Sequence, residues 1–155
     1  MRAHIGLAEP GDLPAVKGLL DESGLPSSDV TAEKLTHFLV ARAGGALAGV
    51  IGVEPLGNDG LLRSAAVAPA LRGGGLGVEL VAALERRARE LGVRRLYLLT
   101  TTAERFFRGR GYGRVARDTA PPAVRGTTEF RDLCASTSVC MMKRLGSERT
   151  RGATR

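Results

Sequence analysis

The most informative part of this 155-residue chain reads Val67-Ala68-Pro69-Ala70-Leu71-Arg72-Gly73-Gly74-Gly75-Leu76-Gly77. A short apolar run typical of a buried strand precedes it, and apolar residues recur at helical spacing from Leu76 to Leu91. A helix start exposes unpaired backbone N–H groups, and glycines let an anion approach those groups closely. The stretch therefore predicts a strand, a glycine turn and a helix that together bind a phosphate-bearing ligand.

Two common nucleotide-binding loops do not match this stretch. A Walker loop requires Lys-Ser or Lys-Thr after its glycines, and neither pair follows here. The dinucleotide pattern Gly-x-Gly-x-x-Gly, begun at Gly73, has Val78 in place of its third glycine. The pattern that does match is Arg-x-x-Gly-x-Gly from Arg72 to Gly77, preceded by Val-x-Pro. A plain strand-to-helix turn without a ligand is the alternative interpretation.

The composition is that of one globular domain, with 43% hydrophobic and 25% charged residues. The length is enough to bury a single core without disulfides or metals. The chain holds no apolar run of eighteen residues, and its N-terminus lacks the apolar core of a signal peptide. We therefore expect a single cytoplasmic domain over residues 1–145 that does not contact a membrane. Residues 146–155 contain no large apolar side chain and are predicted to be a disordered tail.

The net charge of +7 does not by itself predict a nucleic-acid-binding protein. The arginines are dispersed along the chain, and aromatic residues that could stack on bases make up only 4% of it. Some of this positive charge would help to recruit an anionic cofactor. We therefore expect no nucleic-acid partner.

The order of predicted elements favours an α/β fold. Hairpin-like strand pairs come early and crossover helices come in the middle, which indicates a mixed sheet covered by helices. A partly helical stretch begins at Pro121. The predicted strands are 5–8, 38–41, 47–53, 61–67, 95–100, 112–117 and 139–142, and the predicted helices are 12–22, 31–36, 76–91 and 103–110.

The glycine stretch resembles the acyl-coenzyme A loop of the GNAT N-acetyltransferases. Residues 96–102, the pair Phe106-Phe107 and the triplet Arg110-Gly111-Tyr112 are similar to the second conserved block of that family, so the resemblance spans roughly residues 3–145. It implies a mixed, mostly antiparallel sheet flanked by helices. In that fold the fourth and fifth strands, here 61–68 and 95–100, diverge like a V.

The resemblance implies acetyl transfer from acetyl-CoA, a co-substrate, to an amine by direct attack in a ternary complex. Such a reaction needs a base for the amine, a donor for the carbonyl oxygen and a leaving thiolate. The family assigns the oxygen to a backbone N–H that a bulge in the fourth strand frees, close to Ala66 or Val67. The residues implied to bind the coenzyme are Val67, Arg72, Gly73, Gly74, Gly75, Leu76, Gly77 and Phe106.

The candidate base is Glu54, which follows an apolar strand; a solvated carboxylate at a strand end is the alternative. Many family members have a tyrosine acid four residues before the Gly-Phe or Gly-Tyr pair, where this chain has Phe107. Because a thiol pKa of about 8.5 makes the thiolate a tolerable leaving group, water or Thr101 could supply the proton.

Arg63 lies on a strand that otherwise looks buried, so its guanidinium needs an anionic partner. That partner is either a protein carboxylate, from Glu54 or Asp59, or a carboxylate or oxyanion of the acceptor. In the second case Arg63 acts with Ser64 and Arg125 as the acceptor-binding set.

The Leu-Thr-Thr block at residues 99–101 and the proline-led stretch from Pro121 resemble the acetyltransferase domain of N-acetylglutamate synthase. A more specific resemblance connects residues 60–64, 98–102 and 129–134 with the arsenic-resistance N-acetyltransferase branch, to which the chain is most similar. It favours an amino acid or an amine-bearing arsenical as acceptor. The alternatives are an amino-acid N-acetyltransferase of the N-acetylglutamate synthase type and a non-catalytic acyl-CoA sensor. A homodimer is common among such enzymes. Cys134 and Cys140 cannot make a zinc site alone, so we expect no metal; they are predicted to be reduced core thiols or, less favoured, contacts to trivalent arsenic.

Overall fold

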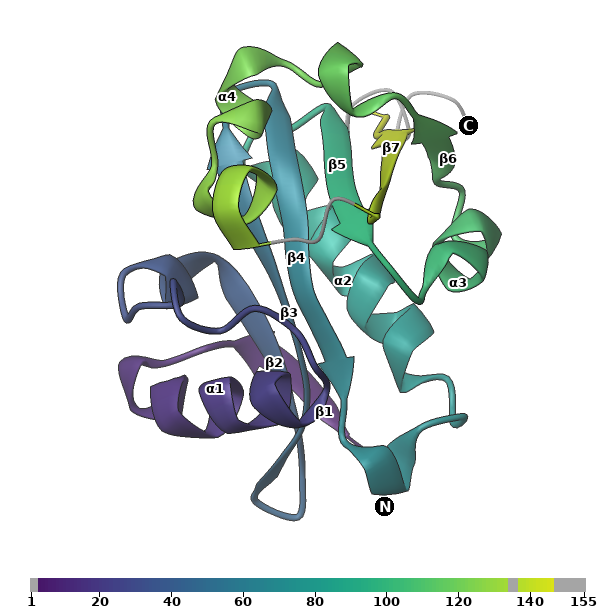
Figure 1. Ribbon diagram of the computed structural model, residues 1–155. Coiled ribbons are helices and arrows are strands. Elements are labelled where there is room, and N and C mark those ends of the chain that lie inside the picture. Colours follow the sequence, from purple (N-terminus) through teal and green to yellow (C-terminus); the bar gives the residue numbers. More distant parts are fainter. Residues whose placement is uncertain (1–2, 134–136, 147–155) are drawn as a thin grey trace. The chain divides into compact units, whose positions relative to one another are not determined.

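The computed structural model describes residues 3–133 and 137–146, and Figure 1 shows the chain coloured along the sequence. The tail predicted at 146–155 lies outside the described residues apart from Gly146. The described residues fall into two compact units, the first within Met1–Glu54 and Arg63–Leu84, the second within Pro55–Leu62 and Glu85–Arg155. The single domain predicted over residues 1–145 stays a prediction.

Seven strands form one sheet in the order β1-β2-β3-β4-β5-β7-β6. Strands β4 and β5 pair in parallel, whereas the pairs β1–β2, β2–β3, β5–β7 and β6–β7 are antiparallel, so the predicted mixed α/β fold is confirmed. The parallel register joins residues 59–61 to residues 95–97, and a V-shaped divergence beyond them stays a prediction. The strands are β1 His4–Leu7, β2 Phe38–Ala43, β3 Ala46–Leu56, β4 Asp59–Val67, β5 Arg95–Thr100, β6 Gly113–Val115 and β7 Val139–Arg144.

The helices agree with the predicted order and differ at their ends. Helix α1 begins at Leu13, after a 3-10 turn at Pro10–Asp12, because Pro14 is tolerated only in the first turn. The helix predicted at 31–36 is a 3-10 helix, Lys34–His37. Other 3-10 turns lie at Pro69–Leu71 and Arg117–Thr119, and a π-helix at Glu129–Leu133. The α-helices are α1 Leu13–Glu22, α2 Leu76–Glu90, α3 Glu104–Gly109 and α4 Pro122–Arg125.

The core of the first unit forms where α1 and the segment after it meet the sheet. The amphipathic face of α1 presents Val16, Leu19 and Leu20 to apolar residues of β2 and β3. Figure 1 shows α1 beside β1 and β2. The buried residues of this cluster are Val16, Leu19, Leu20, Val30, Leu35, Phe38, Val40, Val50 and Ala66.

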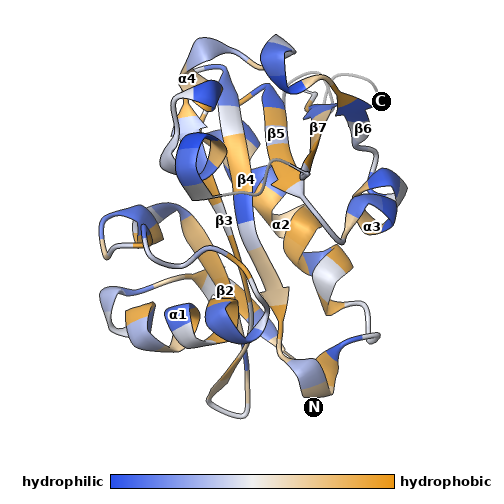
Figure 2. Ribbon diagram, viewed as in Figure 1, coloured by the Kyte–Doolittle hydropathy of each residue, from blue (hydrophilic) through white to orange (hydrophobic). Residues whose placement is uncertain are grey.

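The core of the second unit forms on β5 and β7 and under the segment from 115 to 130. Figure 2 shows that β5 is made largely of hydrophobic residues, in agreement with the burial of Leu96, Tyr97 and Leu98. Burying such side chains contributes on the order of 1.5–3 kcal/mol each. The buried residues of this cluster are Leu61, Tyr97, Ala120, Val124, Phe130 and Cys140.

Gly52 of β3 leaves space for the ring of its cross-strand partner Phe38. A Cβ at Gly52 would lie 2.4 Å from that ring, whose residue is fully buried. We expect Gly52→Ala to lower the free energy of unfolding by about 1–3 kcal/mol, because the ring must move within a packed core. Urea denaturation measures this loss.

Gly18→Ala is the matched control, because Gly18 lies in α1 and a Cβ there meets no atom within 4 Å. Alanine is the better helix former, so this variant should gain roughly 0.5–1 kcal/mol. Equal effects of the two substitutions would contradict the packing argument.

Candidate active site

The glycine stretch forms the predicted connection between β4 and α2. The backbone N–H of Ala68 donates to Ala48 O at 2.8 Å, and the 3-10 turn Pro69–Leu71 follows. Gly73 and Gly75 then have φ values of 88° and 87°, in the left-handed region that favours glycine. These two positions explain why the turn requires glycine, and the predicted order of strand, glycine turn and helix is confirmed.

Arg72 connects this loop to other residues of the first unit. Its Nε donates to Val67 O at 3.0 Å, and its Nη2 lies 3.4 Å from Ser23 Oγ. Residues 72–75 are exposed, whereas Leu76 is buried and anchors the start of α2. An exposed cation and the N-terminal N–H groups of a 15-residue helix therefore lie in the same short segment.

Arg63 is the centre of a buried ion cluster in the first unit. Its side chain is 0% exposed, and its Nη1 and Nη2 donate to the two oxygens of Asp29 at 2.6 Å each. Nη1 also donates to Glu54 Oε2 at 2.7 Å, and Nε donates to Ser64 Oγ at 3.0 Å. Lys34 completes the cluster, 2.8 Å from Asp29 and 3.6 Å from Glu54. The protein itself thus supplies carboxylate partners for this guanidinium.

Of the two protein partners predicted for Arg63, Glu54 pairs with it. Asp59 instead accepts hydrogen bonds from Arg95 at the start of β5. Asp29 was not predicted, because it lies in a turn 34 residues away in sequence and carries no motif. Burial raises the pKa of Asp29, but hydrogen bonds from Arg63 and then Lys34 outweigh it and lower this pKa from 3.8 to about 2.

Ser64 carries the backbone irregularity of β4. Its φ is 62°, and among the described residues it is the one non-glycine residue with a positive φ. Such a conformation costs on the order of 1–3 kcal/mol for a residue with a side chain. The bulge that the resemblance implies near Ala66 or Val67 stays a prediction. The left-handed residue of β4 is Ser64, whose hydroxyl accepts a hydrogen bond from Arg63.

The predicted residues of the second unit have different environments. Phe107 is buried and packs edge-on against Tyr112, with ring centroids 5.6 Å apart, while Phe106 is 36% exposed. Thr101 is exposed just after β5. Arg125 is also exposed, and its Nε donates to Ala120 O at 3.0 Å. Phe107 is therefore a packing residue.

Tyr112 belongs to a buried polar network that the sequence did not indicate. Its hydroxyl donates to Glu85 Oε2 at 2.9 Å, and Lys143 donates to both oxygens of Glu85 and to Arg110 O. Burial, and then the charge of Glu85, raises the pKa of Tyr112 above its ordinary value. This network connects α2, the turn after α3 and β7.

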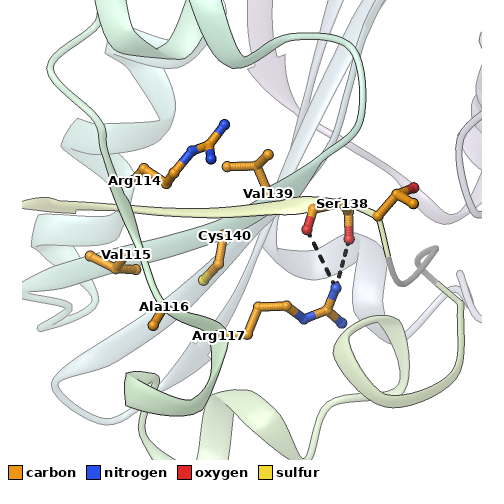
Figure 3. Close-up of a pocket in the computed structure, with 8 residues that line it drawn as sticks. Arg114, Val115, Ala116, Arg117, Ser138, Val139 and Cys140 are labelled. Atoms are coloured by element: carbon orange, nitrogen blue, oxygen red, sulfur yellow. Dashed lines mark hydrogen bonds between the residues drawn. The ribbon is translucent and has the colours of Figure 1, made fainter.

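A surface pocket of about 430 Å³ lies where β6 meets β7 (Figure 3). On one side Arg117 donates to Ser138 Oγ at 3.0 Å and stacks on the ring of Phe130. Cys140 lines the pocket, and burial raises the pKa of its thiol to about 11, so the reactive thiolate is scarce at neutral pH. Cys134 lies outside the described residues, so a two-thiol contact to arsenic stays a prediction.

Within the described residues, no helix is long and apolar enough to cross a membrane, and no group of three acidic, His or Cys residues could hold a metal ion.

A mixed sheet with a parallel β4–β5 pair, and a left-handed glycine turn leading from β4 into α2, are features of the acyl-CoA N-acyltransferase fold. The sequence model of the family described as "Acetyltransferase (GNAT) family" matches residues 17–112. The chain belongs to that family.

Curated relatives carry the name amino-acid acetyltransferase. The chain is 35% identical to one from Pseudomonas syringae pv. syringae over 109 residues, 67% of this chain and 25% of the relative. It is 30% identical to one from Pseudomonas putida over 122 residues, 76% of this chain and 28% of the relative. The chain thus spans about a quarter of the curated relatives it matches.

Solved structures show the same fold. N-acetylglutamate synthase from Neisseria gonorrhoeae, complexed with coenzyme A and N-acetyl-glutamate, has a TM-score of 0.82 and 26% identity, over 94% of this chain and 36% of that one. Rv2747 from Mycobacterium tuberculosis, in complex with CoA and NLQ, has a TM-score of 0.75 and 25% identity, over 92% and 99%.

Acid should destabilise the first unit through Asp29. Its pKa is lowered to about 2, so its contribution to stability is fully present above the ordinary value of 3.8 and is lost as pH falls toward about 2. We expect Asp29→Asn to lower stability near neutral pH and to make the loss of stability across this window smaller. Urea unfolding at a series of pH values measures both effects.

The control is Asp132→Asn, which removes an exposed carboxylate that is paired with Arg131. It should leave the pH dependence of unfolding close to that of the wild type. If Asp29→Asn showed the same pH dependence of unfolding as the wild type, the stabilising role of the Asp29 carboxylate would be contradicted.

Proposed function

We propose that this chain is an acetyl-CoA-dependent N-acetyltransferase whose acceptor is the amine of an amino acid. The observation that carries the proposal is the pair of left-handed glycines, Gly73 and Gly75, between β4 and the N-terminus of α2. They let backbone N–H groups approach a pyrophosphate, and the helix start favours its negative charge. Family membership supports the acetyl donor.

The coenzyme-binding set that we propose is the one read from the sequence. Residues 72–77 hold the pyrophosphate, with Val67 at the end of β4 and Arg72 as the nearby exposed cation. Phe106, which is 36% exposed on α3, offers an aromatic surface to the coenzyme.

In the proposed reaction the acceptor amine attacks the carbonyl carbon of the thioester. The amine loses a proton, the carbonyl oxygen becomes negative until the C–S bond breaks, and coenzyme A leaves as a thiolate that takes up a proton. We assign the base to Glu54 acting through water with Oε1, because Oε2 already accepts from Arg63. A backbone N–H of β4 near Ala66 stabilises the oxygen, and water or Thr101 returns the proton to sulfur.

We infer the class of the acceptor from the names of the relatives. Those reported above are named amino-acid acetyltransferases, and one solved neighbour is described as holding N-acetyl-glutamate, which favours an amino acid. An amine-bearing arsenical is the second candidate, favoured by the motifs at residues 60–64 and 98–102. Arg125 is exposed and suited to bind an acceptor carboxylate. Direct binding by Arg63 would require displacement of Asp29.

A screen of acceptors tests the function directly. The full chain is incubated with acetyl-CoA and either single amino acids or amine-bearing arsenicals, and released thiol is measured. We expect turnover with at least one amino acid. Turnover with arsenicals alone would replace the acceptor class, whereas calorimetric binding of acetyl-CoA without turnover on any amine would favour a sensor.

Gly75→Ala tests the loop. A left-handed conformation costs a residue with a Cβ about 1–2 kcal/mol, so the KM for acetyl-CoA should rise roughly tenfold. Steady-state kinetics with acetyl-CoA varied at saturating acceptor measures this change.

The matched control is Gly45→Ala in the β2–β3 hairpin. Gly45 has a φ of 83°, and a Cβ there meets no atom within 4 Å. It should cost similar stability and leave the KM for acetyl-CoA as in the wild type. If both variants lose stability and neither changes this KM, the loop does not bind the coenzyme.

A further inference from the structure

Two adjacent residues of β4 combine a buried charge with an unfavourable backbone conformation, and the proposed reaction assigns no role to this combination. Arg63 is fully buried, although a buried guanidinium is costly. Ser64 follows it with a φ of 62°, which side-chain-bearing residues rarely adopt. An unfavourable backbone conformation persists only where its surroundings hold it in place.

The contacts around Ser64 identify what holds it. Arg63 Nε donates to Ser64 Oγ at 3.0 Å, within a pair of residues that are both buried. The guanidinium is itself fixed by both oxygens of Asp29 at 2.6 Å and by Glu54 Oε2 at 2.7 Å. Paired, charge-assisted hydrogen bonds of this kind fix orientation as well as position. The hydroxyl of Ser64 is thus held by a cation that cannot rotate freely.

A left-handed residue inside a strand changes the direction of the peptide groups beside it. It turns an N–H or C=O out of the hydrogen-bond ladder, as in a β-bulge. Ser64 lies four residues before Ala68, about 13 Å along a strand, and Ala68 begins the connection to the glycine loop. In the proposed reaction the pantetheine arm separates the pyrophosphate from the thioester, so we expect the reacting carbonyl beside β4 and away from the phosphate loop.

We infer that Arg63 is a positioning residue for acetyl transfer: its tether keeps Ser64 left-handed and so aims a β4 peptide N–H at the thioester oxygen. The inference rests on the proposed function. It also gives Ser64 a role different from acceptor binding, because its hydroxyl accepts the hydrogen bond that holds the backbone of β4 in this conformation. A donor aimed at developing charge affects the transition state more than the binding of either substrate.

Ser64→Ala and Ser64→Gly test the tether as a pair, because both remove the hydroxyl and only glycine adopts a positive φ without steric cost. We expect Ser64→Ala to lower kcat by about tenfold or more, since loss of an oxyanion donor costs up to about a hundredfold to a thousandfold. Ser64→Gly should retain a several-fold higher kcat than Ser64→Ala. The KM for acetyl-CoA should stay within about twofold in both, since the phosphate loop is unaltered. Equal losses of kcat would overturn the inference.

Arg63→Lys tests the cation, since lysine keeps the charge beside Asp29 and Glu54 but lacks the fork that also reaches Ser64. We expect a lower kcat, restored in part by adding Ser64→Gly. Arg95→Lys, at the Arg95–Asp59 ion pair, is the matched control and should keep the wild-type kcat. A double variant no faster than Arg63→Lys would overturn the inference.

Two further outcomes separate this inference from the proposed function. If Arg63→Lys does not fold, as thermal unfolding would show, the Ser64 pair decides the question alone. If the wild-type chain releases no thiol with any acceptor, the proposed function fails and the inference fails with it. Wild-type turnover with equal kcat in Ser64→Ala and Ser64→Gly overturns the inference only.

Discussion

The first unit depends on the pairing of one buried cation. Arg63 has no access to water, so its charge must be balanced within the protein. Asp29 and Glu54 provide that balance from a turn after α1 and from β3. The same guanidinium therefore ties three segments together and holds the left-handed Ser64 beside it. A buried pair of this kind is a weak source of net stability, but removal of one partner is costly because it leaves an unpaired buried charge.

The glycine loop depends on a backbone constraint of a different type. Gly73 and Gly75 need positive φ values, and burial of Leu76 fixes where α2 begins. Arg72 closes the loop through the carbonyl of Val67, which leaves the turn exposed and its shape defined. An anion site made from backbone N–H groups requires this combination of exposure and rigidity.

In the second unit, several aromatic and charged side chains are engaged in packing contacts and hydrogen bonds with one another. Phe107 lies at the position where the family resemblance implied an acid, and it packs on Tyr112. Tyr112 in turn donates to Glu85, and Arg117 is engaged by Ser138 and the ring of Phe130. These contacts stabilise the connections of α3 and β7. In the proposed reaction a tyrosine acid is not required, because a thiolate leaves without strong assistance.

Local patterns in the sequence determined the order of elements, the strand–glycine–helix connection and the family, because backbone preferences act between residues close in the chain. The need of Arg63 for an anion was also predictable, since burial of the strand implied it. The sequence did not determine that Asp29 would meet that need, that Asp59 would pair with Arg95, or that Ser64 would be left-handed. Only the tertiary structure decided these, because hydrogen bonds between residues some 34 positions apart depend on how the chain folds back on itself.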